Sequence, residues 1–103
     1  MIRGTTPTIT YNFPFAVSGI DKIRIYFLQG KETIITKDED DCTMSGQSVS
    51  VTLTEEETYL CNAKKRVETK SRFLLTNGTV GGTKSKFIDV EETGGAKEIL
   101  GSN

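Results

Sequence analysis

Histidine is absent from this sequence of 103 residues, so the usual general base at neutral pH and the commonest transition-metal ligand are missing. The only thiols are Cys42 and Cys61, nineteen positions apart. Two thiols form at most one disulfide or half of a zinc site. We expect two semi-buried free thiols, with a single disulfide as the alternative.

Other catalytic motifs are also missing. No serine lies in a Gly-x-Ser-x-Gly elbow, and neither Gly81-Gly82 nor Gly94-Gly95 begins a phosphate-binding loop that ends in Gly-Lys-Ser/Thr. The carboxylates lie in charged runs rather than in apolar surroundings that would shift a pKa. We therefore predict that the protein is not an enzyme and has no catalytic, cofactor-binding or metal-binding residues.

One run of carboxylates, Asp38-Glu39-Asp40-Asp41, resembles the oxygen-rich ligand sets that hold calcium. Its spacing does not match a calcium-binding helix–loop–helix, which needs a glycine at its sixth position and a distant glutamate. We expect a solvated loop between strands.

A basic segment begins at Lys64-Lys65-Arg66 and continues through Lys70 and Arg72. In a strand Arg66, Lys70 and Arg72 point to the same side and form one cationic face. Readers of nucleic acid add stacking aromatics to such a face, whereas Phe73 lies on the opposite side. Because the net charge is also −1, nucleic acid is not an expected partner.

The two charged regions together suggest an interaction surface. Residues 38–63 contain seven acidic residues and no Lys or Arg, and residues 64–87 contain seven basic residues and one acid. If the regions are separate on the surface, the acidic patch of one molecule meets the basic patch of the next; if adjacent, they only neutralise each other. The candidate interaction residues are Asp38, Glu39, Asp40, Asp41, Lys64, Lys65, Arg66, Lys70 and Arg72.

Alternating apolar and polar residues predict half-buried strands as the elements that position these groups. In residues 8–15, for example, Ile9, Tyr11 and Phe13 share one face. Thr54-Glu55-Glu56-Glu57 has capping-box spacing, so a short helical turn is expected near residues 54–60. Asn77-Gly78 is a hairpin signal. The predicted strands are residues 8–15, 22–28, 32–37, 48–53, 66–76 and 83–90.

These strands predict an all-β protein, a small antiparallel two-sheet sandwich of immunoglobulin-like type with six to seven strands. A small β-barrel is the alternative. We expect one domain over residues 1–103, with a flexible arm at residues 1–6 and a loosely ordered tail at residues 94–103. Tyr59 and Cys61 have the spacing found at the start of strand F of immunoglobulin variable domains.

The chain as a whole resembles small, largely uncharacterised phage and prophage proteins from the structural-gene regions of Gram-positive gut bacteria. The matching segments are residues 1–8, 22–26 and 51–58. The resemblance implies a virion-related structural protein, tail-associated or active in assembly, whose partners are protein subunits or further copies of itself. We expect synthesis in the host cytoplasm without a membrane partner, and a virion-associated location. The alternative function is binding of carbohydrate or another small ligand, with Tyr26, Tyr59 or another surface aromatic as a platform.

Overall fold

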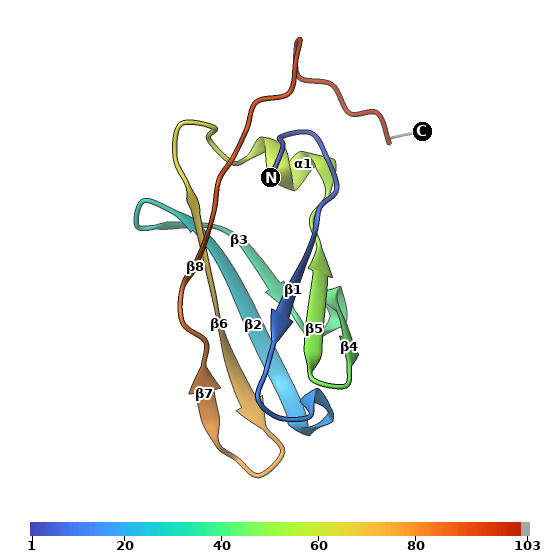
Figure 1. Ribbon diagram of the computed structural model, residues 1–103, viewed down its shortest axis with the longest axis vertical. Coiled ribbons are helices and arrows are strands. Elements are labelled where there is room, and N and C mark those ends of the chain that lie inside the picture. The colour runs from blue at the N-terminus through green and yellow to red at the C-terminus, as the bar shows by residue number, and fades with distance from the viewer. Residues whose placement is uncertain (102–103) are drawn as a thin grey trace.

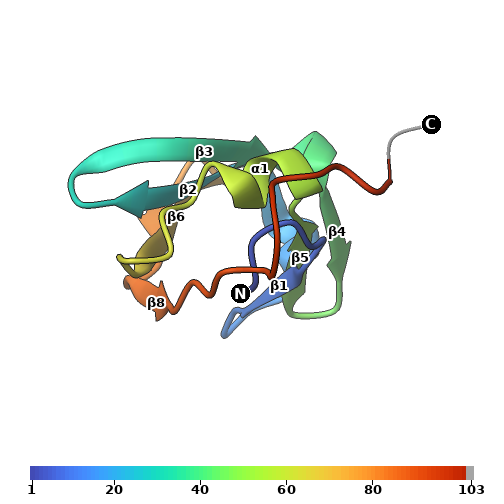
Figure 2. The same cartoon turned by 90° about the horizontal axis from the view of Figure 1, so that it is seen from above.

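The structure is a computed structural model that describes residues 1–101. Two antiparallel sheets face each other, so the molecule is a β-sandwich rather than a barrel (Figures 1 and 2). In the described residues there are eight strands, one short α-helix and two 3-10 turns at 17–19 and 39–41. The strands are β1 (Thr8–Asn12), β2 (Ile20–Gln29), β3 (Glu32–Asp38), β4 (Cys42–Ser45), β5 (Ser48–Thr52), β6 (Val67–Leu75), β7 (Val80–Gly82) and β8 (Lys86–Ile88), and the helix is α1 (Glu55–Tyr59).

The strand order is that of an immunoglobulin-like sandwich. The smaller sheet has the order β1-β5-β4, and the larger has β3-β2-β6, with β7 and β8 pairing the two halves of the outer edge of β6. In immunoglobulin terms these are strands B-E-D and C′-C-F-G. No strand in the described chain occupies the place of strand A beside β1.

The core confirms the predicted alternation. Ile9 and Tyr11 of β1, and Val49 and Val51 of β5, are buried, and so is every second residue of β6 from Val67 to Phe73. The rings of Phe13, Phe15 and Phe73 contact one another with centroids 5.4 to 5.6 Å apart. Burial of these apolar faces between the sheets is the main stabilising term.

The C-terminal hairpin differs from the prediction. Asn77-Gly78 does form the turn, with Gly78 at φ +89°, but the partner strand is β7, which contains Gly81-Gly82, and β8 pairs farther along β6. A Cβ at Gly81 would lie 2.6 Å from the Phe73 ring. The glycine therefore belongs in the strand, because only a residue without a side chain fits over that ring.

The segment between β5 and β6 is partly as predicted. The helical turn is present as α1, and the capping box is formed between Thr54 and Glu57. The expected match to the start of strand F is wrong, because Tyr59 ends the helix and Cys61 precedes β6 by six residues. The loop at residues 61–66 separates this segment from the start of β6. Strand β4 alternates over only four residues, which is too short a pattern to stand out, and it was not predicted.

Both ends of the described chain are bonded to the sandwich. Arg3 N donates to Glu91 O, and the Arg3 guanidinium contacts the Glu92 carboxylate at 2.7 Å. In the tail, Leu100 N donates to the Glu55 carboxylate at 2.8 Å. Residues 102–103 of the predicted tail lie outside the described residues. No helix among residues 1–101 is long and apolar enough to cross a membrane.

Candidate functional site

The outward face of the larger sheet gathers cations from two strands that are distant in sequence. Because β2 and β6 are paired, Arg24 lies opposite Arg72. Lys22 and Lys70 lie on the same outward side of these strands, as their exposure and register show. We call this set the basic face: Lys22, Arg24, Lys70 and Arg72.

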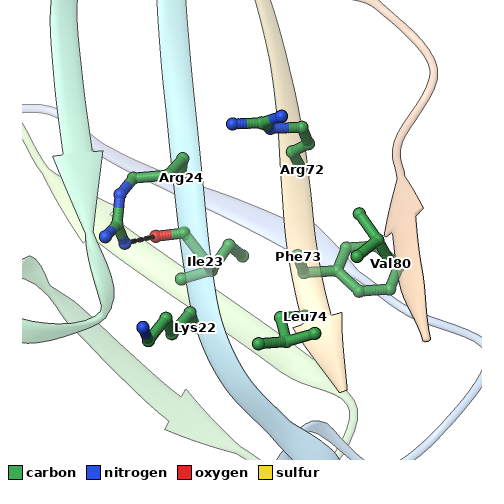
Figure 3. A pocket seen from close by; sticks show the side chains of 7 residues that line it. All are labelled: Lys22, Ile23, Arg24, Arg72, Phe73, Leu74 and Val80. Carbon is green, nitrogen blue, oxygen red and sulfur yellow. Dashed lines mark hydrogen bonds between the residues drawn. The ribbon is translucent and has the colours of Figure 1, made fainter. Parts of the chain in front are cut away.

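A shallow groove of about 260 Å³ is lined by three of the four cations of the basic face (Figure 3). Lys22, Arg24 and Arg72 provide its cationic side, and Leu74 and Val80 provide an apolar side. Val80 is 65% exposed. The groove thus combines charged nitrogen donors with exposed apolar carbon.

Arg24 is the one cation of the basic face that already has a partner. Its Nη1 donates to the Glu39 carboxylate at 2.7 Å and to Ile23 O at 2.8 Å. The Ile23 amide also donates to Glu39, at 3.1 Å. These hydrogen bonds, that of Ile23 first, hold the pKa of Glu39 below its usual value. The pair relieves the repulsion between Arg24 and Arg72, which face each other across the strands.

Two further carboxylates of the predicted acidic run, those of Asp38 and Asp41, are engaged in local structure. Asp38 is the cap of the 3-10 turn at residues 39–41, and its carboxylate accepts from Asp40 N at 2.9 Å. The Asp41 carboxylate accepts in return from Asp38 N at 3.0 Å. The run thus forms a capped turn between β3 and β4, which agrees with the predicted loop between strands. Nowhere in residues 1–101 do three potential metal-ligating side chains gather.

The acids of the helix are engaged in a similar way. Glu57 pairs with Lys37 at 2.7 Å and accepts from Thr54 N at 2.9 Å. Glu55 accepts from the amides of Leu100 and Gly101. Most acidic side chains of residues 38–63 therefore stabilise local structure.

The predicted basic residues lie in two places. Lys70 and Arg72 belong to the basic face, whereas Lys64 and Lys65 lie in the exposed loop before β6. Gln29 fixes this loop by donating to the carbonyls of Asn62 and Lys65 at 2.8 and 3.0 Å. Arg66 lies over the ring of Phe87, with 4.6 Å between its guanidinium carbon and the ring centroid.

The described chain contains three ion pairs, and none joins the predicted acidic residues to the predicted basic ones. Lys64, Lys65, Arg66, Lys70 and Arg72 therefore stay unpaired with carboxylates of residues 1–101, while most of the acids are occupied internally. No ion pair therefore joins the two regions, and the cations of the basic region remain available on the surface.

Sequence reasoning missed how Lys22, Arg24 and Tyr26 join this surface. The alternation of β2 already placed these side chains outward, but the pairing of β2 with β6 joins residues more than forty positions apart and has no local signal. Phe73 is buried as predicted, yet Tyr26 lies opposite Lys70 and Phe87 opposite Glu68 on the outward side. The basic face therefore does have aromatic neighbours.

The thiols match the favoured expectation, since both cysteines are free. Burial and the nearby carboxylates raise the pKa of Cys42 to about 11. Burial also raises the pKa of Cys61. A reactive thiol needs a lowered pKa, so neither cysteine has the electrostatic setting of a nucleophile.

Of the two tyrosines named for the small-ligand hypothesis one is not available as a platform, whereas Phe87 is exposed. Tyr59 is buried, and its hydroxyl donates to Glu98 O at 3.0 Å. Only Tyr26 of the two named tyrosines is partly exposed on a sheet face. Comparison of the sequence with models of known protein families and with curated proteins gives no match to either.

Proposed function

We propose that this protein is a non-enzymatic structural or assembly protein that binds acidic surfaces of other protein subunits through its basic face. The observation behind the proposal is the unpaired charge of Lys22, Lys70 and Arg72 beside the apolar rim of Leu74 and Val80. Complementary charge steers such partners together and selects among them.

A partner subunit fits this face better than a second copy of the chain. Most carboxylates of residues 38–63 already bond to the chain's own amides or cations. In this region a second copy would offer only the carboxylates of Asp40 and Glu56 without such bonds. The resemblance to phage and prophage structural proteins gives the setting of the proposal, a virion- or tail-associated role.

The test compares two double variants with the same change of net charge. K70E/R72E reverses the basic face, and K64E/K65E reverses the loop before β6. In cells that express the protein with its neighbouring genes, chemical cross-linking and mass spectrometry identify the subunit in contact. We expect an acidic subunit whose cross-link is lost in K70E/R72E and kept in K64E/K65E.

Sedimentation of the purified complex at low and high salt gives an independent reading. Salt screens exposed charges over about 10 Å at 0.1 M ionic strength, so the complex should dissociate as salt rises. A chain that sediments as a monomer at every concentration, with no cross-linked subunit, would contradict the proposal. Equal loss of binding in both double variants would place the contact elsewhere than the basic face.

A further inference from the structure

Strand β1 is an open edge. It pairs only with β5, and no other strand of the described chain lies against its second side. Leu53 N donates to Pro7 O and Phe13 N donates to Gln47 O, which shows that the odd-numbered residues bond to β5. By the alternation of an antiparallel ladder, the N–H and C=O groups of Thr8, Thr10 and Asn12 point away from β5.

This edge is short, but it has neither a charged side chain nor a bulge to prevent pairing with another chain. Edge strands are normally blocked by charged side chains, bulges or covering loops. Residues 4–20 contain no charged residue at all, although a quarter of the protein is charged. By contrast, β3, which forms one edge of the larger sheet, carries Glu32, Lys37 and Asp38.

A groove borders the open edge. Two adjoining hollows of about 410 and 350 Å³ lie between β1 and the segment 83–88, on the side of the sandwich where β1 and β8 both lie (Figure 2). One hollow is lined by Ile9, Ile88 and Met1, and the other by Tyr11, Lys84 and Lys86. The arm closes the groove at one end, where Ile2 bridges to Glu91.

Lys86 indicates the chemistry of the occupant. It pairs in register with Thr69, whose side chain is completely buried, so Lys86 lies on the core-facing side of the sheet. It is nevertheless exposed, because nothing covers the space between β1 and β8. Neither Lys84 nor Lys86 has an ion pair among residues 1–101.

We infer that β1 accepts an antiparallel strand from an extended segment of another protein, in the place of strand A. The residue of that segment opposite Ile9 is apolar and meets Met1 and Ile88. The residue opposite Tyr11 is acidic and meets Lys84 and Lys86. Backbone hydrogen bonds to Thr8, Thr10 and Asn12 supply affinity, and the two inward side chains supply specificity. The inference rests on the proposed function only in that the partner is a protein.

The probe is the acetylated peptide Ser-Thr-Glu-Thr-Val-Thr-Ser, which places Glu opposite Tyr11 and Val opposite Ile9. Titrated into the isotope-labelled protein and followed by nuclear magnetic resonance, it should slow hydrogen exchange of the Thr8, Thr10 and Asn12 amides. A peptide with Lys in place of Glu should bind at least about tenfold more weakly. The K86E variant should reverse that preference.

Backbone methylation of the peptide tests strand pairing without changing the protein. The amide of the central Thr faces β1, and the amide of Val faces away. Methylation of the first should weaken binding about tenfold, and methylation of the second should leave it within about twofold. Equal effects would overturn strand addition at this edge.

Two further outcomes would overturn the inference. The first is no binding at about 1 mM peptide. The second is slowed exchange of the same three amides in the protein alone at high concentration, which would make a second copy the occupant. K70E/R72E should bind the peptide normally, so a failure of the basic face and a failure of the β1 edge are separable.

Discussion

At the scale of single residues, the carboxylates and the cations of this protein have different tasks. Glu39 is held by one amide and one guanidinium, and Asp38 and Asp41 cap a turn. Lys70 and Arg72 contact no carboxylate of residues 1–101. Counting charges along the sequence left open whether the acidic and basic regions are separate or adjacent, because the count does not show which charges are satisfied by local hydrogen bonds. An acidic run after a strand is well suited to capping a turn.

Cys42 gives a prediction at this scale. Its pKa of about 11 lies two units above the ordinary value of 9.0, because the thiol is partly buried near Asp41, Asp38 and Glu39. In a Cys61→Ala variant at pH 8, alkylation by iodoacetamide should be about a hundredfold slower for the folded than for the unfolded chain, since only the thiolate reacts. The rate should continue to rise up to pH 11, and a plateau near pH 9 would contradict the shift.

The same shift has a consequence for stability. Because the pKa is raised in the folded state, the stabilising contribution of the neutral thiol is complete below pH 9 and is lost as the pH rises through 11. Cys42→Ser removes the titration. Between pH 9 and pH 11 the natural chain should therefore lose unfolding free energy relative to this variant. From pH 6 to pH 8 the difference between the two should stay constant.

At the scale of elements, those with a strong local pattern were predictable. The sequence predicts β2, β3 and β5 to within two residues at each end. Alternation marks β2 and β5, and β3 follows as the hairpin partner of β2 after the turn at Gly30. The split of the last strand into β7 and β8 was not predictable. It depends on the Phe73 ring beneath Gly81, which is a contact between strands rather than a property of either. The short β4 exists because β5 offers it an edge.

The cap of α1 gives a prediction for an element. Thr54 Oγ1 accepts from Glu57 N at 3.1 Å, and the Glu57 carboxylate accepts from Thr54 N. Thr54→Ala should lower the free energy of unfolding by about 1 kcal/mol, because one helical amide loses its acceptor. Thr54→Ser keeps the acceptor and should stay close to the natural chain. Urea unfolding of the three proteins measures both, and equal stabilities for the Ala and Ser variants would contradict the role of the cap.

At the scale of the whole molecule, the sandwich could be inferred from the sequence but its surfaces could not. One-sided strands have to be stacked, whatever their order. Which strands pair decides that Arg24 lies beside Arg72, and that β1 is left at an edge next to Lys86. Both candidate surfaces depend on these long-range pairings. They therefore lie beyond what alternation along the chain can predict.

A buried hydrogen bond between two side chains also joins the two sheets, and it gives a prediction for the molecule as a whole. The Tyr11 hydroxyl on β1 hydrogen-bonds Thr69 Oγ1 on β6, and both side chains are buried. Tyr11→Phe leaves the Thr69 hydroxyl buried without this partner and should cost about 1–3 kcal/mol, measured by urea unfolding. Thr69→Val likewise leaves the buried Tyr11 hydroxyl without this partner.

The double variant Y11F/T69V then decides whether the contact couples the sheets. Because it removes both polar groups together, it should cost clearly less than the sum of the single variants. Additive costs would mean that the two hydroxyls act independently and that apolar packing alone holds the sheets together. A coupling of about 1 kcal/mol would show that the bond fixes how β1 sits over β6. That placement in turn determines the width of the groove in which we propose that the partner strand binds.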